Sequence, residues 1–437
     1  MAAGRRGTRR RKPWRPSNLK VKRSYRYELD PNAQQRVLLA KHAGAARFAY
    51  NWGLARRIEL YQQTGKTTNA IEQHRELNRL KKTEYPWLYE VSKCAPQEAL
   101  RDLDRAFQNF FRGLKKGRKV GFPKFRKKGR DDRFRLTGAI RVRGRAVQLP
   151  RLGLIRLKEE PCVQGRILSA TVSREADRWY VSLTVVVDLP DPELVQGPAV
   201  GIDVGVAHFA TLVQEDGTVE KIPAPRPLLR HLRLLRRRQW RHSKKQKCSR
   251  NRKKSALRLA RLHRRICHIR QDFLHKLTTH LAKTKRVIVV EDLSVSGLLK
   301  NPKLARHIAD VGWGEFRRML AYKCGWYGSR LVEANRYFPS SKMCSCCGQV
   351  LELLPLDVRE WDCPGCGTHH DRDVNAAKNL LALCPDLNGQ LAVQVTTASS
   401  AGSDACGHCG WMKQEATRTF VHELQNGETR WGGRYAP

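Results

Sequence analysis

The first part of the chain changes from a basic arm to a strand and then to helices. Residues 1–23 show no hydrophobic period and predict a basic arm that is disordered or ordered only on a nucleic acid, whereas residues 24–30 alternate hydrophobic and polar side chains and predict a strand. Residues 31–129 are predicted to be helical. Asn32 can cap the first helix, and a second helix follows Pro96 with apolar residues spaced by threes and fours.

A strand-rich segment follows at residues 134–189. Residues 167–172 and 179–187 alternate or are rich in β-branched side chains, and a polar turn at 174–177 separates them. We expect a small β-barrel or sheet here. The prolines and the glycine that follow predict a linker, with a domain boundary near residue 196.

The second half begins with strands and continues with long helices. Residues 199–204 predict a buried strand, and residues 206–222 predict a hairpin that turns at Asp216 and Gly217. Two long helices are predicted within residues 226–285. The later predicted elements are a buried strand at 286–290 that ends at Glu291, a helix at 316–327, a short strand at 331–334, a helix that starts near Asp373, and a poorly ordered tail after Asn388.

The charge of the chain favours a polyanionic partner. Its length of 437 residues is enough for about three domains. It holds 85 Lys and Arg against 40 Asp and Glu, a net charge of +45, which disfavours a small-molecule enzyme without nucleic acid. Between Arg226 and Arg270 there are 19 Lys or Arg and no acid. The basic loop at 112–130, interrupted by Phe122 and Phe125, fits a nucleic-acid backbone, with a solvated charge run as the alternative.

The cysteines and the hydrophobic stretches of the chain indicate the cellular compartment in which we expect the protein. No apolar stretch approaches the length of about 20 residues that a spanning helix needs, and the basic N-terminus is not followed by the apolar core of a secretory signal. We therefore expect no membrane contact and a location in the prokaryotic cytoplasm, associated with the nucleoid. Thirteen cysteines, several of them paired as Cys-x-x-Cys, then indicate metal binding and not a disulfide framework.

Two Cys-x-x-Cys pairs predict a structural zinc site. The pairs are separated by 15 residues, which is within the spacing of such sites. Four thiolates complete a tetrahedral Zn²⁺ and leave no position open for catalysis. The predicted ligands are Cys344, Cys347, Cys363 and Cys366. Cys406 and Cys409 form a third pair without a partner pair, and we expect free thiols there.

Three separate stretches place carboxylates at the ends of predicted elements. Asp203 interrupts an apolar strand, Glu291 ends a second strand, and Asp371 and Asp373 lie at the start of a helix. Each acid alone is more often structural. Their order of strand with hairpin, strand and helix favours an RNase H-like fold in which three carboxylates hold two Mg²⁺ or Mn²⁺ ions about 4 Å apart for phosphodiester hydrolysis.

In combination these motifs resemble the TnpB family, transposon-encoded RNA-guided nucleases close to the miniature type V CRISPR effectors. The resemblance covers most of the chain and rests on residues 50–52, 121–125, 201–205, 290–293, 340–342 with the zinc cysteines, and 371–379. The long basic N-terminal arm departs from a minimal TnpB. This departure slightly favours a CRISPR-associated derivative, and the choice between a transposon and a CRISPR system stays open.

The resemblance implies an α/β multidomain fold. Its parts would be a wedge β-barrel from 1–30 and 130–195, a helical recognition domain at 31–129, an RNase H-like RuvC nuclease domain at 196–387 with a zinc-ribbon insertion at 340–370, and a flexible tail at 388–437. The catalytic, magnesium-binding acids implied are Asp203, Glu291 and Asp373, because in the family the acid of the Asp-x-Asn motif is the catalytic one.

The resemblance also suggests residues that contact nucleic acid. Arg336 and Ser341 are candidates to touch the scissile strand. Candidate readers of a short motif beside the target are Tyr50, Asn51, His74 and Asn78, with ordinary helix surface as the alternative. Basic candidates for holding RNA and heteroduplex are Lys124, Arg126, Arg237, Arg238, Lys244, Lys245, Arg252 and Lys253.

The favoured function is that of a guide-RNA-dependent DNA endonuclease. It would bind a guide RNA, recognise a short motif beside a double-stranded DNA target, and cut both strands with one two-metal site, leaving 5′ phosphate and 3′ hydroxyl ends. Its cofactors would be Mg²⁺ or Mn²⁺, structural Zn²⁺ and the guide RNA, and a monomer is favoured. The alternatives are an RNA-guided regulator without cleavage, a DNA transposase, and a zinc-ribbon nucleic-acid-binding protein whose acids serve the fold.

Overall fold

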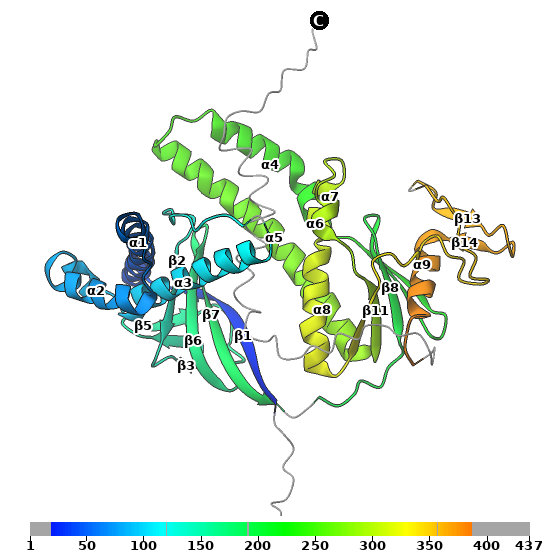
Figure 1. Ribbon diagram of the computed structural model, residues 1–437, viewed down its shortest axis with the longest axis horizontal. Coiled ribbons are helices and arrows are strands. Elements are labelled where there is room, and N and C mark those ends of the chain that lie inside the picture. Colours follow the sequence, from blue (N-terminus) through cyan, green and yellow to red (C-terminus); the bar gives the residue numbers. More distant parts are fainter. Residues whose placement is uncertain (1–18, 119, 190–191, 356, 387–437) are drawn as a thin grey trace, which may run out of the picture. The chain divides into compact units, whose positions relative to one another are not determined.

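The computed structural model describes residues 19–118, 120–189, 192–355 and 357–386 (Figure 1). Its contacts separate into two compact units, which are described one at a time. Of the described residues, the N-terminal unit contains 22–187 and 226–271, and the C-terminal unit contains 188–225 and 272–386 together with residues 19–21. Residues 1–18 of the predicted arm and the tail at 388–437, with Cys406 and Cys409, lie outside the described residues.

A seven-stranded sheet in the order β2-β6-β7-β1-β5-β4-β3 forms the base of the N-terminal unit. Its strands are β1 (Leu19–Asp30), β2 (Arg133–Thr137), β3 (Arg141–Arg143), β4 (Ala146–Leu149), β5 (Gly153–Leu157), β6 (Arg166–Glu175) and β7 (Arg178–Leu189). The long hairpin β6–β7 confirms the predicted strand pair and turns at Ala176, whose φ is 57°. The prediction of an unstructured arm is wrong for residues 19–23, because Lys20 and Lys22 occupy exposed, alternating positions of β1.

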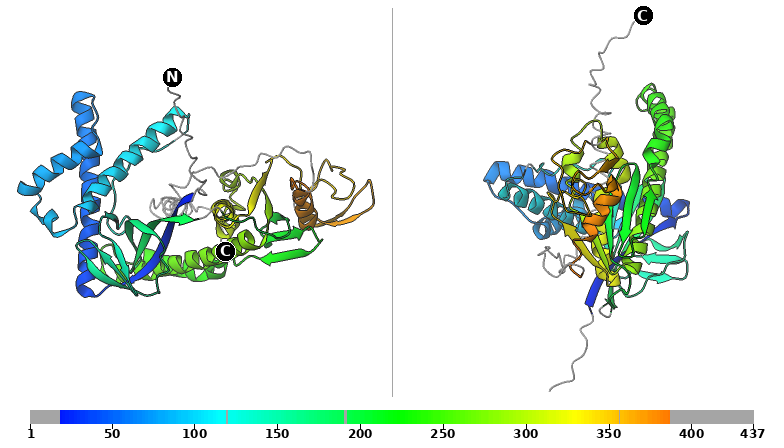
Figure 2. Two further views of the ribbon diagram at one scale, coloured as in Figure 1. Left: turned by 90° about the horizontal axis from the view of Figure 1, so that it is seen from below. Right: turned by 90° about the vertical axis from the view of Figure 1, so that its right-hand side faces the viewer.

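Helices α1 (Ala33–Thr64), α2 (Ala70–Thr83) and α3 (Cys94–Lys115) lie to one side of this sheet (Figure 2, blue to cyan), with a short 3-10 turn at Pro86–Glu90. The predicted cap is confirmed: the Asn32 side chain accepts a hydrogen bond from the backbone of Gln35. The sequence pattern did not separate α2 and the 3-10 turn from the helices around them.

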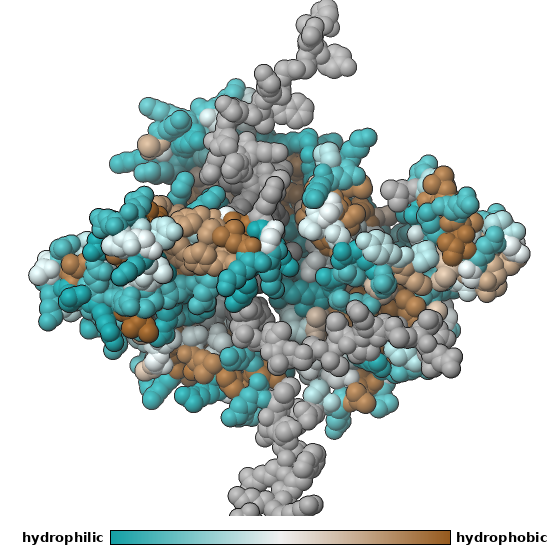
Figure 3. Space-filling model, viewed as in Figure 1, coloured by the Kyte–Doolittle hydropathy of each residue, from teal (hydrophilic) through white to brown (hydrophobic). Residues whose placement is uncertain are grey.

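Helices α4 (Pro227–Ser243) and α5 (Arg250–Thr284) confirm the two predicted basic helices. Leu235, Leu262 and Ile266 are buried between them in the N-terminal unit. Their exposed surface is largely hydrophilic (Figure 3) because the cationic side chains lie outside this narrow apolar seam.

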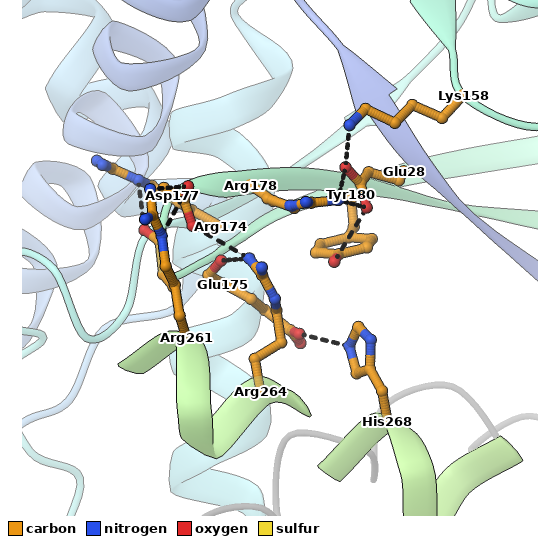
Figure 4. Close-up of polar contacts among 11 residues, drawn as sticks. Glu28, Lys158, Arg174, Glu175, Asp177, Arg178, Tyr180, Arg261, Arg264 and His268 are labelled. Atoms are coloured by element: carbon orange, nitrogen blue, oxygen red, sulfur yellow. Dashed lines mark hydrogen bonds and ion pairs between the residues drawn. The ribbon is translucent and has the colours of Figure 1, made fainter. Parts of the chain in front are cut away.

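The first part of α5 is attached to the β6–β7 turn by ion pairs (Figure 4). Asp177 accepts from Arg261 at 2.8 Å and from Arg264 at 3.2 Å, and His268 Nε2 lies 3.4 Å from Glu175. The acidic residues of this turn therefore fix one side of the helix, whose many other cationic side chains are of the kind that binds phosphates.

A five-stranded sheet in the order β10-β9-β8-β11-β12 is the centre of the C-terminal unit. Its strands are β8 (Val200–Val204), β9 (His208–Gln214), β10 (Val219–Pro223), β11 (Val287–Glu291) and β12 (Arg330–Ala334). β8, β11 and β12 run parallel, and β8, β9 and β10 pair antiparallel, which confirms the predicted hairpin.

Each face of this sheet has its own hydrophobic core. Val200, Ile202 and Phe209 pack with the end of α5, with α7 (Ala305–Val311) and with α8 (Trp313–Tyr327). On the other face, Val287 and Val289 pack with α9 (Arg372–Leu381). Figure 1 shows α8 and α9 on opposite sides of β8 and β11.

A small ribbon separates β12 from α9. It contains β13 (Glu360–Asp362) and β14 (His369–Asp371), which pair antiparallel. These strands, α7 and the short helix α6 (Val295–Leu298) are too short to carry a hydrophobic period and were not predicted. Among the described residues, no helix is both long enough and apolar enough to cross a membrane.

Candidate functional site

Asp203 and Glu291 lie on neighbouring parallel strands and on one face of the sheet. β8 and β11 pair with Val289 opposite Gly201, so continuing the register by two residues brings Glu291 opposite Asp203. Since side chains alternate between the faces of a strand, both acids share the face of Gly201 and Val289, which is the face that α9 covers.

Gly201 allows α9 to pack directly on β8. A Cβ atom at this position would lie 2.1 Å from the carbonyl oxygen of Ala377 and 2.6 Å from the backbone nitrogen of Leu381. No side chain fits in that space. The close packing carries the first turn of α9, which contains Asp373, toward the ends of the two strands.

Two of the predicted acids, Glu291 and Asp373, act electrostatically on the third, Asp203. Burial raises the pKa of Asp203 well above its usual range, and the negative charges of Glu291 and Asp373 raise it further, while Arg372 opposes the shift. Burial also raises the pKa of Glu291, although a hydrogen bond from the Ser340 hydroxyl partly offsets it. Carboxylates that repel one another in a partly buried site are the arrangement that a divalent cation stabilises.

Asp371 and Asp373 have different environments. Asp371 accepts from the backbone of Asp373 and Val374 as the N-cap of α9, and its other oxygen lies 2.7 Å from Lys221 Nζ. The negative charge of Asp373 raises the pKa of Asp203, and its carboxylate oxygen lies 3.5 Å from Arg359 Nη1. These contacts therefore give Asp371 a structural role. Asp373 is left to form, with Asp203 and Glu291, what we call the acid cluster.

Two arginines converge on the acid next to Glu291. Arg336 Nη2 lies 2.6 Å from the Asp292 carboxylate, and Arg317 bonds the other oxygen of the same carboxylate. Arg317 also lies 3.6 Å from Glu333. Arg336 was a sequence candidate for the scissile strand, whereas Arg317 was not, because nothing in the pattern of α8 distinguishes it from a surface arginine.

The four predicted zinc ligands come together. The sulfur atoms of Cys344, Cys347, Cys363 and Cys366 all lie within 4.8 Å of one another. His370 is buried beside them, with Nε2 3.0 Å from Cys344 Sγ and its ring 4.7 Å from that of Trp361. This set of four thiols fits a tetrahedral Zn²⁺.

The acid cluster is wider than the thiol cluster. Within the described part of the chain, the ligand atoms of the four cysteines all lie within 4.8 Å of one another, and the three carboxylates do not form so compact a group. One tetrahedral ion needs that compactness, whereas three carboxylates around two ions about 4 Å apart span more space. The oxygen donors and their mutual repulsion fit Mg²⁺ or Mn²⁺.

Some of the residues predicted to contact nucleic acid instead contact other residues of the protein. Tyr50 is buried, with the Arg126 guanidinium 3.9 Å from the centre of its ring. Asn51 accepts from the Arg126 backbone at 2.7 Å and donates to the Arg126 carbonyl at 3.0 Å. Arg126 also pairs with Asp102 at 3.3 Å. These three residues anchor the 121–130 loop, while Lys124 on that loop is exposed.

Other predicted contacts lie on helix surfaces. His74 and Asn78 share one face of α2, with 3.5 Å between the imidazole Nε2 and the amide nitrogen. In the α4–α5 pair, Arg252 donates to the carbonyls of His242 and Lys245 at 3.2 and 2.7 Å and closes the turn between the helices. Arg238 donates to the Arg258 carbonyl at 3.1 Å. The exposed cations of this pair include Arg237, Lys244 and Lys253.

Three polar residues around the acids belong to the motifs quoted from the sequence, but the sequence did not assign them a role in the site. The Ser340 hydroxyl bonds Glu291, whereas the sequence analysis selected its neighbour Ser341. Asn375 and Asn379 are buried on α9 and bond the backbone of residues 340–345. The Asp-x-Asn-x-x-x-Asn spacing could have indicated the two asparagines, since residues four apart share a helix face.

Three family models match the chain. A "Probable transposase" model (OrfB_IS605) matches residues 182–302, a "Cas12f1-like, TNB domain" model matches residues 313–380, and a "Helix-turn-helix domain" model matches residues 19–66. In this chain the last of these stretches contains β1 and the single long helix α1.

Two bacterial relatives match over most of their length. The chain is 41% identical over 369 residues to the "Putative RNA-guided DNA endonuclease" of Streptomyces pristinaespiralis, covering 83% of this chain and 89% of the relative. It is 33% identical over 382 residues to the protein InsQ of Escherichia coli K12, which has the same description, covering 83% of this chain and 92% of InsQ.

One solved structure shares the fold. The protein in "Cryo-EM structure of the Cas12f1-sgRNA-target DNA complex" aligns with a TM-score of 0.52 and 13% sequence identity, covering 83% of this chain and 99% of that chain.

Proposed function

The chain belongs to the TnpB family, and from this we propose that it is an RNA-guided DNA endonuclease. A guide RNA would pair with one strand of a double-stranded DNA target and carry the sequence specificity, while the protein reads a short motif beside the target. One RuvC-like site would cut both strands in turn.

The observation that supports this proposal is that two acids far away in the sequence lie near enough to a third to raise its pKa. Asp203, Glu291 and Asp373 come from two strands and one helix, yet Glu291 and Asp373 both act on the pKa of Asp203. A protein that only bound nucleic acid would gain nothing from placing mutually repelling carboxylates among its cations.

These three acids would hold the catalytic metal. Bound Mg²⁺ or Mn²⁺ would supply an activated water and stabilise the leaving 3′ oxygen of the cut strand. The protein would contribute the orientation of each carboxylate. α9 fixes Asp373 against the sheet through the contact at Gly201, and the β8–β11 register fixes Asp203 beside Glu291.

Arg336 and Arg317 would orient the DNA strand at this site. Both guanidiniums are held next to Glu291 by the Asp292 carboxylate. Each keeps donors beyond that ion pair, and guanidinium groups match the geometry of phosphate oxygens. Arg336 is the better candidate because about half of its side chain is exposed, 49% against 38% for Arg317.

The basic helices and the ribbon would have supporting roles. The exposed cations of α4 and α5, among them Arg237, Lys244 and Lys253, would bind backbone phosphates of guide RNA and heteroduplex. Zn²⁺ held by the four cysteines would stabilise the ribbon, whose strand β14 leads directly into α9. The zinc would act on the fold and not on the cleavage chemistry.

The transposase alternative has one observation in its favour, the description of the family model that matches residues 182–302. A transposase would join transposon ends in the absence of RNA. An RNA-guided nuclease instead needs a guide for every cut, and the two activities can be separated in one reaction series.

The test is to purify the full chain from its host, sequence the RNA that copurifies, and assay cleavage of plasmids that carry a matching target. We expect a discrete RNA that ends in a variable stretch, and cutting only of the plasmid that matches it. Asp203→Ala should bind the same target without cutting it. Strand joining without RNA, or cutting that persists in Asp203→Ala, would refute the proposal.

A further inference from the structure

The segment between β12 and the ribbon touches the acid cluster through one serine. Ser340 is 5% exposed, and its hydroxyl donates to Glu291 Oε1. The next residue, Ser341, is half-buried and does not make this bond. Two adjacent serines therefore differ in whether they reach a carboxylate of the cluster.

Ser340 is itself held by the helix that carries the third acid. Asn379 Nδ2 donates to the Ser340 carbonyl at 2.7 Å and to the Met343 carbonyl at 2.6 Å. One turn earlier, Asn375 donates to the Met343 carbonyl at 2.7 Å and accepts from the Ser345 backbone at 2.9 Å. α9 thus fixes the path of the chain from Ser340 to Ser345.

We infer that Ser340 is a positioning residue for Glu291, and that α9 sets its location through Asn379. This inference rests on the proposed function, because it assigns Glu291 as a metal ligand. A hydroxyl bonded to one carboxylate oxygen restricts the rotation of the group, and the second oxygen would then be available to a bound ion. Asp373 and Glu291 are then both positioned by α9, the first directly and the second through Ser340.

The expected size of the effect follows from other metal sites. Removing a hydrogen-bond partner of a ligand costs about 10- to 100-fold in metal affinity or activity. The loss should appear in metal binding and in the rate of cutting, and not in the affinity for DNA, because Ser340 is buried and its contacts are with the protein.

The experiment compares Ser340→Ala with Ser341→Ala as a matched control. Mn²⁺ binding to the full, zinc-loaded chain without RNA is titrated by electron paramagnetic resonance. Cleavage by the guide-loaded protein is measured as kcat and KM over a series of Mg²⁺ concentrations. We expect Ser340→Ala to weaken Mn²⁺ binding and lower kcat by about 10-fold or more with KM for DNA unchanged, and Ser341→Ala to bind Mn²⁺ as the wild type does.

Several results would overturn the inference. Equal Mn²⁺ affinity in Ser340→Ala and the wild type is one, and loss of zinc or a large drop in Tm in Ser340→Ala is another, since the serine would then serve the fold. Ser340→Thr keeps the hydroxyl, so a threonine variant with wild-type Tm should recover Mn²⁺ binding, and its failure to do so also counts against the inference. If the wild type cuts no target at all, the proposed function fails, while the Mn²⁺ titration still decides the role of Ser340.

Discussion

Gly201→Ala is the substitution that most directly tests the packing of α9 against β8. The new methyl carbon would start 2.1 Å from the Ala377 carbonyl oxygen, and real contacts of this kind are longer than 3.0 Å. The two nearest atoms belong to the backbone of α9, so no side-chain rotation can relieve the clash. The helix must move away from β8 by about 1 Å.

The consequence for activity should exceed the consequence for stability. Overpacking of this kind costs about 1–3 kcal/mol, which a unit with cores on both faces of its sheet can tolerate. The same shift moves Asp373 relative to Asp203. A displacement of about 1 Å in a catalytic group can lower the rate by about 100-fold, and we expect a loss of that order in cleavage.

The assay measures guided cleavage, guided binding and Tm for Gly201→Ala and for Gly325→Ala. Gly325 lies on α8, and a methyl group added there would have no neighbouring atom within 4 Å, so its substitution should leave cutting unchanged. Target binding should survive in both variants. Wild-type cleavage by Gly201→Ala would refute the claim that α9 delivers the third acid to this site.

Three further predictions concern the acids, the zinc and the attachment of α5. Asp373→Asn should abolish cleavage, whereas Asp371→Asn should keep most of it because asparagine also caps helices; the reverse order in a cleavage assay would contradict the assignment. Removing zinc with a chelator, or substituting Cys363→Ser, should lower Tm and stop cleavage together, and a zinc-free chain that still cuts would contradict the role of the ribbon. The hydrogen bond from Arg261 lowers the pKa of Asp177 to about 2, so its stabilisation is present above about pH 4 and is lost as the pH falls toward 2. Asp177→Asn should therefore lower the free energy of unfolding by about 1 kcal/mol near neutral pH, and urea denaturation should show this difference closing near pH 2.

Local signals accounted for much of the fold. The cap at Asn32, the Asp216–Gly217 turn and the paired cysteines each act over a few residues, so the chain displays them directly. The apolar strands that carry Asp203 and Glu291 were predicted for the same reason. The short elements α6, α7, β13 and β14 depend on their surroundings and carry no period of their own.

The polar contacts of the site depend on the folded backbone and could not be predicted. Ser340 and Ser341 are chemically identical neighbours, and only the path fixed by Asn379 decides which of them reaches Glu291. Tyr50 and Asn51 were candidate readers of the motif beside the target, with ordinary helix surface as the alternative, and in the structure both contact Arg126 inside the N-terminal unit. A side chain's direction in such cases is set by tertiary packing and not by residue type.

The most direct measurement is the anomalous diffraction of Mn²⁺ in crystals of the full chain. We expect two peaks about 4 Å apart, each within bonding distance of oxygens from Asp203, Glu291 or Asp373. Crystals of Asp203→Ala should lose at least one peak. Ordered manganese elsewhere on the protein, with these three carboxylates free of metal, would contradict the claim that they form one catalytic site.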